Sequence, residues 1–125
     1  MLDASALLAY LHGEAGAEPV ETALQESAMS SVNWAEVIQK ALARGVDIIG
    51  MREELAALGL EIRPFDGEDA ERAGQLWPLT QSQGLSLGDR ACLALGLRLQ
   101  APVLTADRAW TPLGSILGIS IQAVR

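Results

Sequence analysis

The 125-residue sequence contains only one cysteine, one histidine and one lysine, and it has no long apolar segment. Cys92 cannot form an intramolecular disulfide, and because it lies in an apolar helical stretch we expect a buried, structural thiol. The longest uninterrupted apolar run, Ala6 to Leu11, is far shorter than the ~20 residues that span a bilayer. The sequence therefore predicts a cytoplasmic protein that is neither secreted nor inserted in a membrane.

Positive charge is also scarce. Nine Lys and Arg residues stand against sixteen Asp and Glu residues, which gives a formal net charge of −7. Neutralisation of phosphates is the main source of non-specific affinity for nucleic acid, so this balance argues against a broad basic binding surface. Any contact with nucleic acid must be local. The acids could equally form ordinary solvated faces that keep a small domain soluble.

Half of the residues are apolar, so a chain of this length can bury a core without a disulfide. No repeat, low-complexity tract or linker interrupts it, which predicts one domain over residues 1–125. Short strand-like segments alternate with helical ones, and this pattern predicts a doubly wound α/β domain with a parallel sheet covered on both faces. The expected strands are 28–30, 60–64, 103–105 and 116–124, and the expected helices are 4–11, 19–26, 31–45, 47–58, 68–83 and 86–99.

The segment from Ser86 to Asp107 combines a helix start, a break and a strand end. Ser86 followed by Asp89 is a capping-box pattern ahead of an apolar stripe. The helix ends before Pro102, because the residue preceding a proline avoids the helical region. Val103 to Thr105 is typical of a short buried strand. Asp107 follows its carboxyl end, the edge of an α/β sheet where ligands usually bind.

Asp3, Glu36 and His12 each have a structural interpretation as well as a functional one. Asp3 lies at a strand-to-helix junction, where a short acid acts as an N-cap. Glu36 shares a helix face with Asn33 and Lys40, and a Glu four residues before a Lys favours a solvated pair. His12 precedes a glycine, so we assign it to a helix end and not to a metal or catalytic role.

Asp3, Asp89 and Asp107 all fall at starts of helices or ends of strands, and such junctions share one edge of a parallel sheet. Two charges ~5 Å apart at an effective dielectric of 20 repel by about 3 kcal/mol, so clustered carboxylates need protons or divalent cations. Oxygen ligands without His or Cys indicate Mg²⁺ or Mn²⁺ and not zinc.

Four motifs with acidic residues occur in order along the chain. They are Leu2-Asp3-Ala-Ser5, Ser30-Ser-Val-Asn33-Trp-Ala-Glu36, Leu85-Ser-Leu-Gly-Asp89-Arg90 and Leu104-Thr105-Ala-Asp107-Arg108. Together they resemble the PIN-domain ribonucleases, and most of all the VapC-like toxins of type II toxin–antitoxin modules. The resemblance covers essentially the whole chain and implies a three-layer α/β/α sandwich with a short central parallel sheet.

The resemblance implies a divalent-metal-dependent endoribonuclease that hydrolyses RNA phosphodiester bonds, pairs with an antitoxin and forms a homodimer. A bound Mg²⁺ or Mn²⁺ activates water and neutralises transition-state charge, so no histidine base is required. By position, the catalytic and metal-binding acids are Asp3, Glu36, Asp89 and Asp107, and the supporting hydroxyls are those of Ser5 and Thr105.

Arg90 and Arg108 each follow one of these acids directly, and both could reach substrate phosphates from the rim of the site. Pairing with nearby acids on the surface is the alternative, since arginine suits both roles. The sequence departs from the family pattern at its start, where only Met1 and Leu2 precede Asp3. Either the start of the chain is trimmed or the first strand is very short.

A second function from another class is a catalytically degenerate PIN-like module that binds RNA or a partner protein without cleaving. In that case a metal would add stability or nothing, and never turnover. A phosphoacceptor receiver domain also holds Mg²⁺ with acids at a sheet edge, but it needs a lysine after a late strand. Lys40 is the only lysine in the chain, so the receiver interpretation is rejected.

Overall fold

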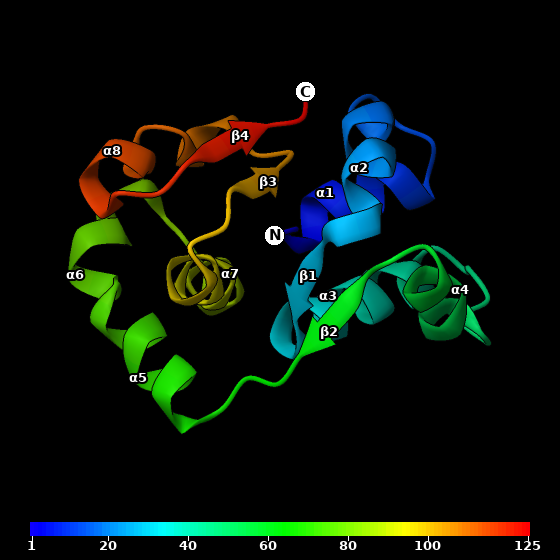
Figure 1. Ribbon diagram of the computed structural model, residues 1–125, viewed down its shortest axis with the longest axis horizontal. Coiled ribbons are helices and arrows are strands. Elements are labelled where there is room, and N and C mark those ends of the chain that lie inside the picture. Colours follow the sequence, from blue (N-terminus) through cyan, green and yellow to red (C-terminus); the bar gives the residue numbers. More distant parts are fainter.

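The computed structural model describes residues 1–125, in which helices alternate with short parallel strands (Figure 1). The strands are β1 (Ala28–Ser30), β2 (Glu61–Arg63), β3 (Val103–Thr105) and β4 (Ile121–Ala123). The helices are α1 (Ala4–Leu11), α2 (Ala17–Ala23), α3 (Ser31–Ala43), α4 (Met51–Ala57), α5 (Gly67–Gln75), α6 (Trp77–Thr80), α7 (Leu87–Leu99) and α8 (Leu113–Leu117). Three single turns of 3₁₀-helix are η1 (Leu24–Glu26), η2 (Gln81–Gln83) and η3 (Arg108–Trp110).

The sheet is completed at its centre by the first residues of the chain. β1 pairs in parallel with β2, and β3 pairs in parallel with β4. Leu2 lies between the two pairs, where it forms a parallel bridge with Leu104 and donates its amide to the Ala28 carbonyl at 3.0 Å. Figure 1 shows the N-terminus between the two pairs of strands. Leu2 is therefore the residue that joins the two pairs of strands into one sheet.

The two faces of the sheet are covered by separate apolar clusters. Leu2 and Met29 face the first cluster, together with buried residues of α1, α2, α3 and α4. Met1 and Val103 face the second cluster, together with buried residues of α5, α7 and α8. Neighbouring residues of a strand point to opposite faces, so this division follows from the strand periodicity. The predicted three-layer α/β/α sandwich is confirmed.

Two predicted elements were wrong in their bounds. The helix expected over 47–58 begins only at Met51, because the Asp47 carboxylate accepts the Ile49 amide at 3.0 Å and holds a turn. The strand expected over 116–124 is confined to β4, because its first residues belong to α8, which ends at Gly118 in the left-handed region. The apolar residues of α8 and β4 together form an alternating pattern that is typical of one continuous strand.

Smaller corrections concern α2, α3 and the helix expected over 68–83. The second helix begins at Ala17 and not at Pro19. The N-cap of α3 is Ser30 and not Ser31, the residue at which the expected helix starts. The Ser30 hydroxyl accepts a hydrogen bond from the Val32 amide at 3.2 Å. The helix expected over 68–83 is divided at Leu76. α5 ends at Gln75, and α6 follows with a proline in its first turn.

One buried ion pair that the sequence did not predict fixes α5 against α7. The Asp69 side chain is only 3% exposed, and Arg98 contacts it through Nε at 2.9 Å and Nη2 at 3.2 Å. Two parallel contacts of this kind restrict both side chains. The pair therefore helps to hold α7, which carries Asp89 at its first turn, in one position on the sheet.

No helix has both the length and the apolar character needed to cross a membrane.

Gly59 provides a test of the packing between α4 and the segment before β1. Its φ is +110°, and a Cβ there would collide with the main chain of Gln25. Gly45 is also left-handed, with φ +72°, but open space surrounds it. We expect Gly45→Ala to lower the free energy of unfolding by about 1 kcal/mol and Gly59→Ala to lower it by several times that amount. Urea unfolding of both variants measures the difference, and equal losses would contradict this packing.

Candidate active site

Asp3 is the most constrained acid of the structure. It follows the bridging residue Leu2, is 3% exposed, and caps α1 by accepting the Ala6 amide at 2.8 Å. The Ser5 hydroxyl lies 2.8 and 2.9 Å from its two carboxylate oxygens, and Thr105 Oγ1 donates to Oδ2 at 2.6 Å. Both carboxylate oxygens are therefore fixed by groups of the protein.

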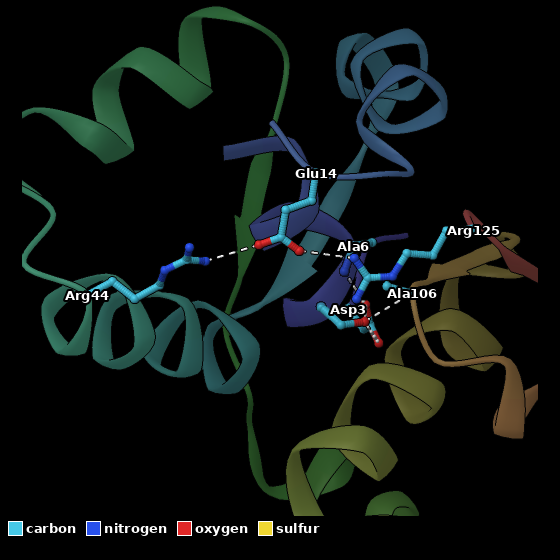
Figure 2. A network of polar contacts seen from close by, with 7 residues as sticks. Asp3, Ala6, Glu14, Arg44, Ala106 and Arg125 are labelled. Carbon is cyan, nitrogen blue, oxygen red and sulfur yellow. Dashed lines mark hydrogen bonds and ion pairs between the residues drawn. The ribbon is translucent and has the colours of Figure 1, made fainter. Parts of the chain in front are cut away.

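The same hydroxyls connect Asp3 to the segment after β3. The Ala106 amide donates to Ser5 Oγ at 2.9 Å, and the Asp107 amide donates to Thr105 Oγ1 at 3.0 Å. Figure 2 shows Asp3 beside Ala6 and Ala106. The Asp107 side chain is exposed and caps η3 by accepting the Ala109 amide at 2.9 Å. Asp107 is thus linked to Asp3 through Thr105, with its carboxylate turned toward its own helical turn.

Asp89 lies at the first turn of α7 in a complete capping box. The Ser86 amide donates to Asp89 Oδ2 at 2.9 Å, and the Asp89 amide donates to Ser86 Oγ at 3.1 Å. The capping pattern predicted from the sequence is confirmed. The other carboxylate oxygen of Asp89 accepts no hydrogen bond from the protein, so capping leaves this oxygen available to a ligand.

Glu36 is held by Asn33 and contacts α7. The buried Asn33 amide group donates to Glu36 Oε1 and to the Gly88 carbonyl, both at 2.9 Å. A Cβ on Gly88 would collide with the Glu36 carboxylate, so the glycine makes room for it. Glu36 forms no ion pair with Lys40, which was the alternative interpretation of their spacing.

Sequence reasoning assigned no role to Asn33 or Gly88. Asn33 lies three residues before Glu36 on the same helix face, and an asparagine in a helix is a signal for such a bond. Gly88 could not be recognised in this way, because its contact with α3 joins segments far apart in the chain.

Burial and negative charge together define the electrostatics of the site. Burial raises the pKa of Asp3 to about 6, although hydrogen bonds from Thr105, Ala6 and Ser5 oppose the shift. Complete burial raises the pKa of the Cys92 thiol well above its usual value, and the carboxylates of Asp3, Asp89 and Glu36 raise it further. The same three carboxylates therefore make the surroundings of Cys92 electrically negative.

The donor chemistry of this region suits a hard divalent cation, but the side chains do not form a closed cage. No three His, Cys, Asp or Glu side chains lie close enough together to hold a metal ion. Glu36, Asp89 and Asp107 each keep one carboxylate oxygen without a hydrogen-bond donor from the protein. Oxygen ligands of this kind suit Mg²⁺ or Mn²⁺.

The two arginines that follow Asp89 and Asp107 are engaged by carbonyl groups and not by acids. Arg90 is half-buried and donates through Nη1 to the Ala73 carbonyl at 3.0 Å. Arg108 is exposed and donates through Nε to the Arg125 carbonyl. Neither forms an ion pair, so the alternative of surface pairing with nearby acids is absent from the structure.

The raised pKa of Asp3 predicts a pH-dependent stability in the presence of a chelator. The folded chain binds this proton more tightly than the unfolded chain, whose Asp pKa is ~3.9. The resulting stabilisation is therefore present below pH ~4 and is lost as the pH rises through about 6. At pH 7.5 we expect Asp3→Asn, which mimics the protonated acid, to exceed the parent protein in unfolding free energy by about 3 kcal/mol.

Urea unfolding between ~pH 4 and ~pH 8 measures this difference. Glu71→Gln is the matched control, because Glu71 is an exposed acid on α5 with no hydrogen bond or ion pair. The advantage of Asp3→Asn should disappear near the acidic end of the range. An advantage that is the same at both ends would show that Asp3 does not titrate as described.

The sequence was also compared with known proteins. The sequence profile of the PIN domain matches residues 1–113. The structure is similar to a chain of a toxin-antitoxin complex from Klebsiella pneumoniae, with a TM-score of 0.71 and 22% identity over 99% of this chain and 96% of that chain. No curated protein matches the sequence significantly. The structural likeness concerns the fold, whereas the profile match spans most of the chain, and the protein therefore belongs to the PIN domain family.

Proposed function

We propose that the protein is a divalent-metal-dependent endoribonuclease that hydrolyses RNA phosphodiester bonds. The observation that carries this proposal is that contacts of the protein join these acids in two pairs. The Glu36 carboxylate lies against Gly88, the residue before Asp89. The Thr105 hydroxyl is hydrogen-bonded both to the Asp3 carboxylate and to the Asp107 amide. Membership of the PIN domain family, whose members are generally nucleases, supports the same activity.

The roles of the residues follow from their contacts. A bound Mg²⁺ or Mn²⁺ would lower the pKa of a water molecule and neutralise charge on the reacting phosphate. Glu36, Asp89 and Asp107 would supply ligands through their free oxygens, and Asp3 would be the rigid fourth acid. Ser5 and Thr105 keep Asp3 oriented, and Asn33 keeps Glu36 against α7. The positive N-terminal ends of α1 and α7 reduce repulsion between the acids they carry.

We further propose that this nuclease is a cytoplasmic, VapC-like toxin that forms a homodimer and is controlled by an antitoxin. The similar structure from Klebsiella pneumoniae belongs to a toxin-antitoxin complex, which supports an antitoxin partner. Apolar side chains left on the surface, such as Ile49 and Leu58 on either side of α4, offer area for a protein partner. A short reading frame just upstream that encodes a DNA-binding antitoxin would add support.

The second candidate is a non-cleaving PIN module that binds RNA or protein. It is favoured by one observation, which is that both oxygens of the Asp3 carboxylate are already hydrogen-bonded within the protein. In this case the acids would bind a cation weakly or not at all. The two candidates differ in whether RNA is turned over.

Cleavage of labelled RNA by the purified protein distinguishes them. With Mg²⁺ or Mn²⁺ we expect cleavage that chelator abolishes. Asp89→Asn and Asp107→Asn should each lower the rate by roughly 100-fold, because each removes one ligand of a cation that supplies several kcal/mol of charge stabilisation.

Glu71→Gln, purified in the same way, is the control for the substitution of an acid outside the site and should cleave at the parent rate. Cleavage that persists in both Asn variants would contradict the assignment of these acids. Metal-independent binding without cleavage would favour the second candidate.

Gly88 gives an independent test, because Gly88→Ala removes no acid. The added methyl group must displace the Glu36 carboxylate from its position against α7. We expect a loss of cleavage on the order of tenfold to 100-fold, the size seen when a supporting contact of a metal site is lost. Gly74→Ala on α5, where a Cβ meets nothing within 4 Å, is the matched control and should leave the cleavage rate unchanged. Equal rates in the two variants would show that Glu36 has no part in the reaction.

A further inference from the structure

A cavity of about 380 Å³ lies beside the acidic site, between α1, α3 and the C-terminal residue. Its polar lining consists of Ser5, His12, Glu14, Lys40, Arg44 and Arg125. Ser5 belongs to both regions, because its hydroxyl contacts the Asp3 carboxylate at 2.8 Å. Ser5 therefore connects the lining of the cavity to the Asp3 carboxylate.

This cavity is basic in a strongly acidic chain. Three of the nine Lys and Arg residues line it, whereas Glu14 is its only acid. The only histidine of the chain is also there, and its Nε2 atom is buried without a hydrogen-bond partner. Lys40 is exposed and forms no ion pair. The cavity thus combines net positive charge with polar groups that have no partner, and these are the features that a local contact with nucleic acid requires in an acidic protein.

Glu14 occupies the position of an anion within this cavity. Its Oε1 contacts Arg44 Nη1 at 3.0 Å, and its Oε2 contacts Arg125 Nη1 at 3.1 Å. Figure 2 shows the carboxylate reaching Arg44 on one side and Arg125 on the other. Guanidinium groups bind carboxylate and phosphate oxygens in the same manner. These ion pairs are solvent-exposed and therefore weak, so a phosphate could replace the carboxylate at little cost.

The cavity lies farther along α3 than Glu36, because Lys40 and Arg44, which line it, follow Glu36 in the sequence. Lys40 and Arg44 follow Glu36 at intervals of four residues, so they lie ~6 and ~12 Å farther along the same helix face. A strand whose reacting phosphate lay at the acids could continue over this face. A carboxylate from a protein partner could bind in the cavity without any connection to Asp3, whereas an RNA strand would contact both regions.

We propose that the cavity binds a backbone phosphate of the RNA strand next to the phosphate that reacts at the acidic site, and that Glu14 occupies this position until RNA displaces it. The inference rests on the proposed function in taking RNA as the ligand. It adds Lys40, Arg44 and Arg125 as substrate-binding residues outside the acidic motifs, with Glu14 as an internal competitor.

The test is RNA binding in chelator, where no cleavage occurs. Fluorescence anisotropy of a labelled single-stranded RNA is measured against salt concentration for the parent protein, Lys40→Ala and Arg44→Ala. Each variant should bind about fivefold more weakly and should lower the slope of log affinity against log salt by about 0.7, the value for one lost phosphate contact on a single strand. Arg52→Ala removes an exposed arginine on α4, away from the cavity, and should change neither quantity.

Glu14→Gln separates binding from a structural role. Removal of the competing carboxylate should tighten RNA binding about threefold, because the two arginines are released. If Glu14 only ties the C-terminal residue to α3, the variant will bind RNA no better than the parent and will merely unfold more easily. That result overturns the role of Glu14 as a competitor.

The outcome is independent of whether the protein is a nuclease. If the parent protein cleaves RNA with Mg²⁺ but Lys40→Ala and Arg44→Ala bind like Arg52→Ala, the cavity proposal is wrong and the nuclease proposal stands. If no cleavage occurs but the variants lose binding as expected, the cavity proposal stands and the nuclease proposal is wrong. Cavity-dependent binding of a labelled oligoglutamate peptide, with RNA binding unchanged, would assign the cavity to a protein ligand and would also overturn the inference.

Discussion

The burial of one carboxylate, that of Asp3, is the constraint on which the rest of this site depends. A buried charge is tolerated only when polar groups or a cation compensate for it. Here the amide of Ala6 and the hydroxyls of Ser5 and Thr105 provide that compensation. Thr105 belongs to β3, so satisfying Asp3 also fixes the position of the first residues between the two halves of the sheet.

The other acids surround this centre without closing on it. Glu36 and Asp89 are positioned by contacts that their own helices make, namely the bond from Asn33 and the capping box with Ser86. Capping and ligand binding are compatible, because each carboxylate has two oxygens and capping uses only one. The acidic region and the basic cavity meet at Ser5. The net charge of −7 does not show that positive charge is concentrated in one part of the surface. Only the arrangement of charges in space reveals where a polyanion could bind.

Local patterns predicted much of this structure from the sequence. The spacing of Ser86 and Asp89 was sufficient for the capping box, and the apolar strands were sufficient for the layered sheet. The bounds of α4 and α8 were missed because turns held by Asp47 and Gly118 interrupt otherwise regular apolar patterns. The contact of Gly88 with Glu36 and the cavity around Glu14 were not predictable, since both join segments that are distant in the chain.

The proposed activity requires the acids at this edge of the sheet to form one cation site. Paramagnetic broadening of amide NMR signals by substoichiometric Mn²⁺ locates such a site, because broadening marks the residues around the bound ion. We expect selective broadening at Ala4, Ser5, Gly88 and Asp89, and its loss in Asp89→Asn. Broadening confined to the exposed acids at the start of α5, or unchanged in that variant, would contradict it.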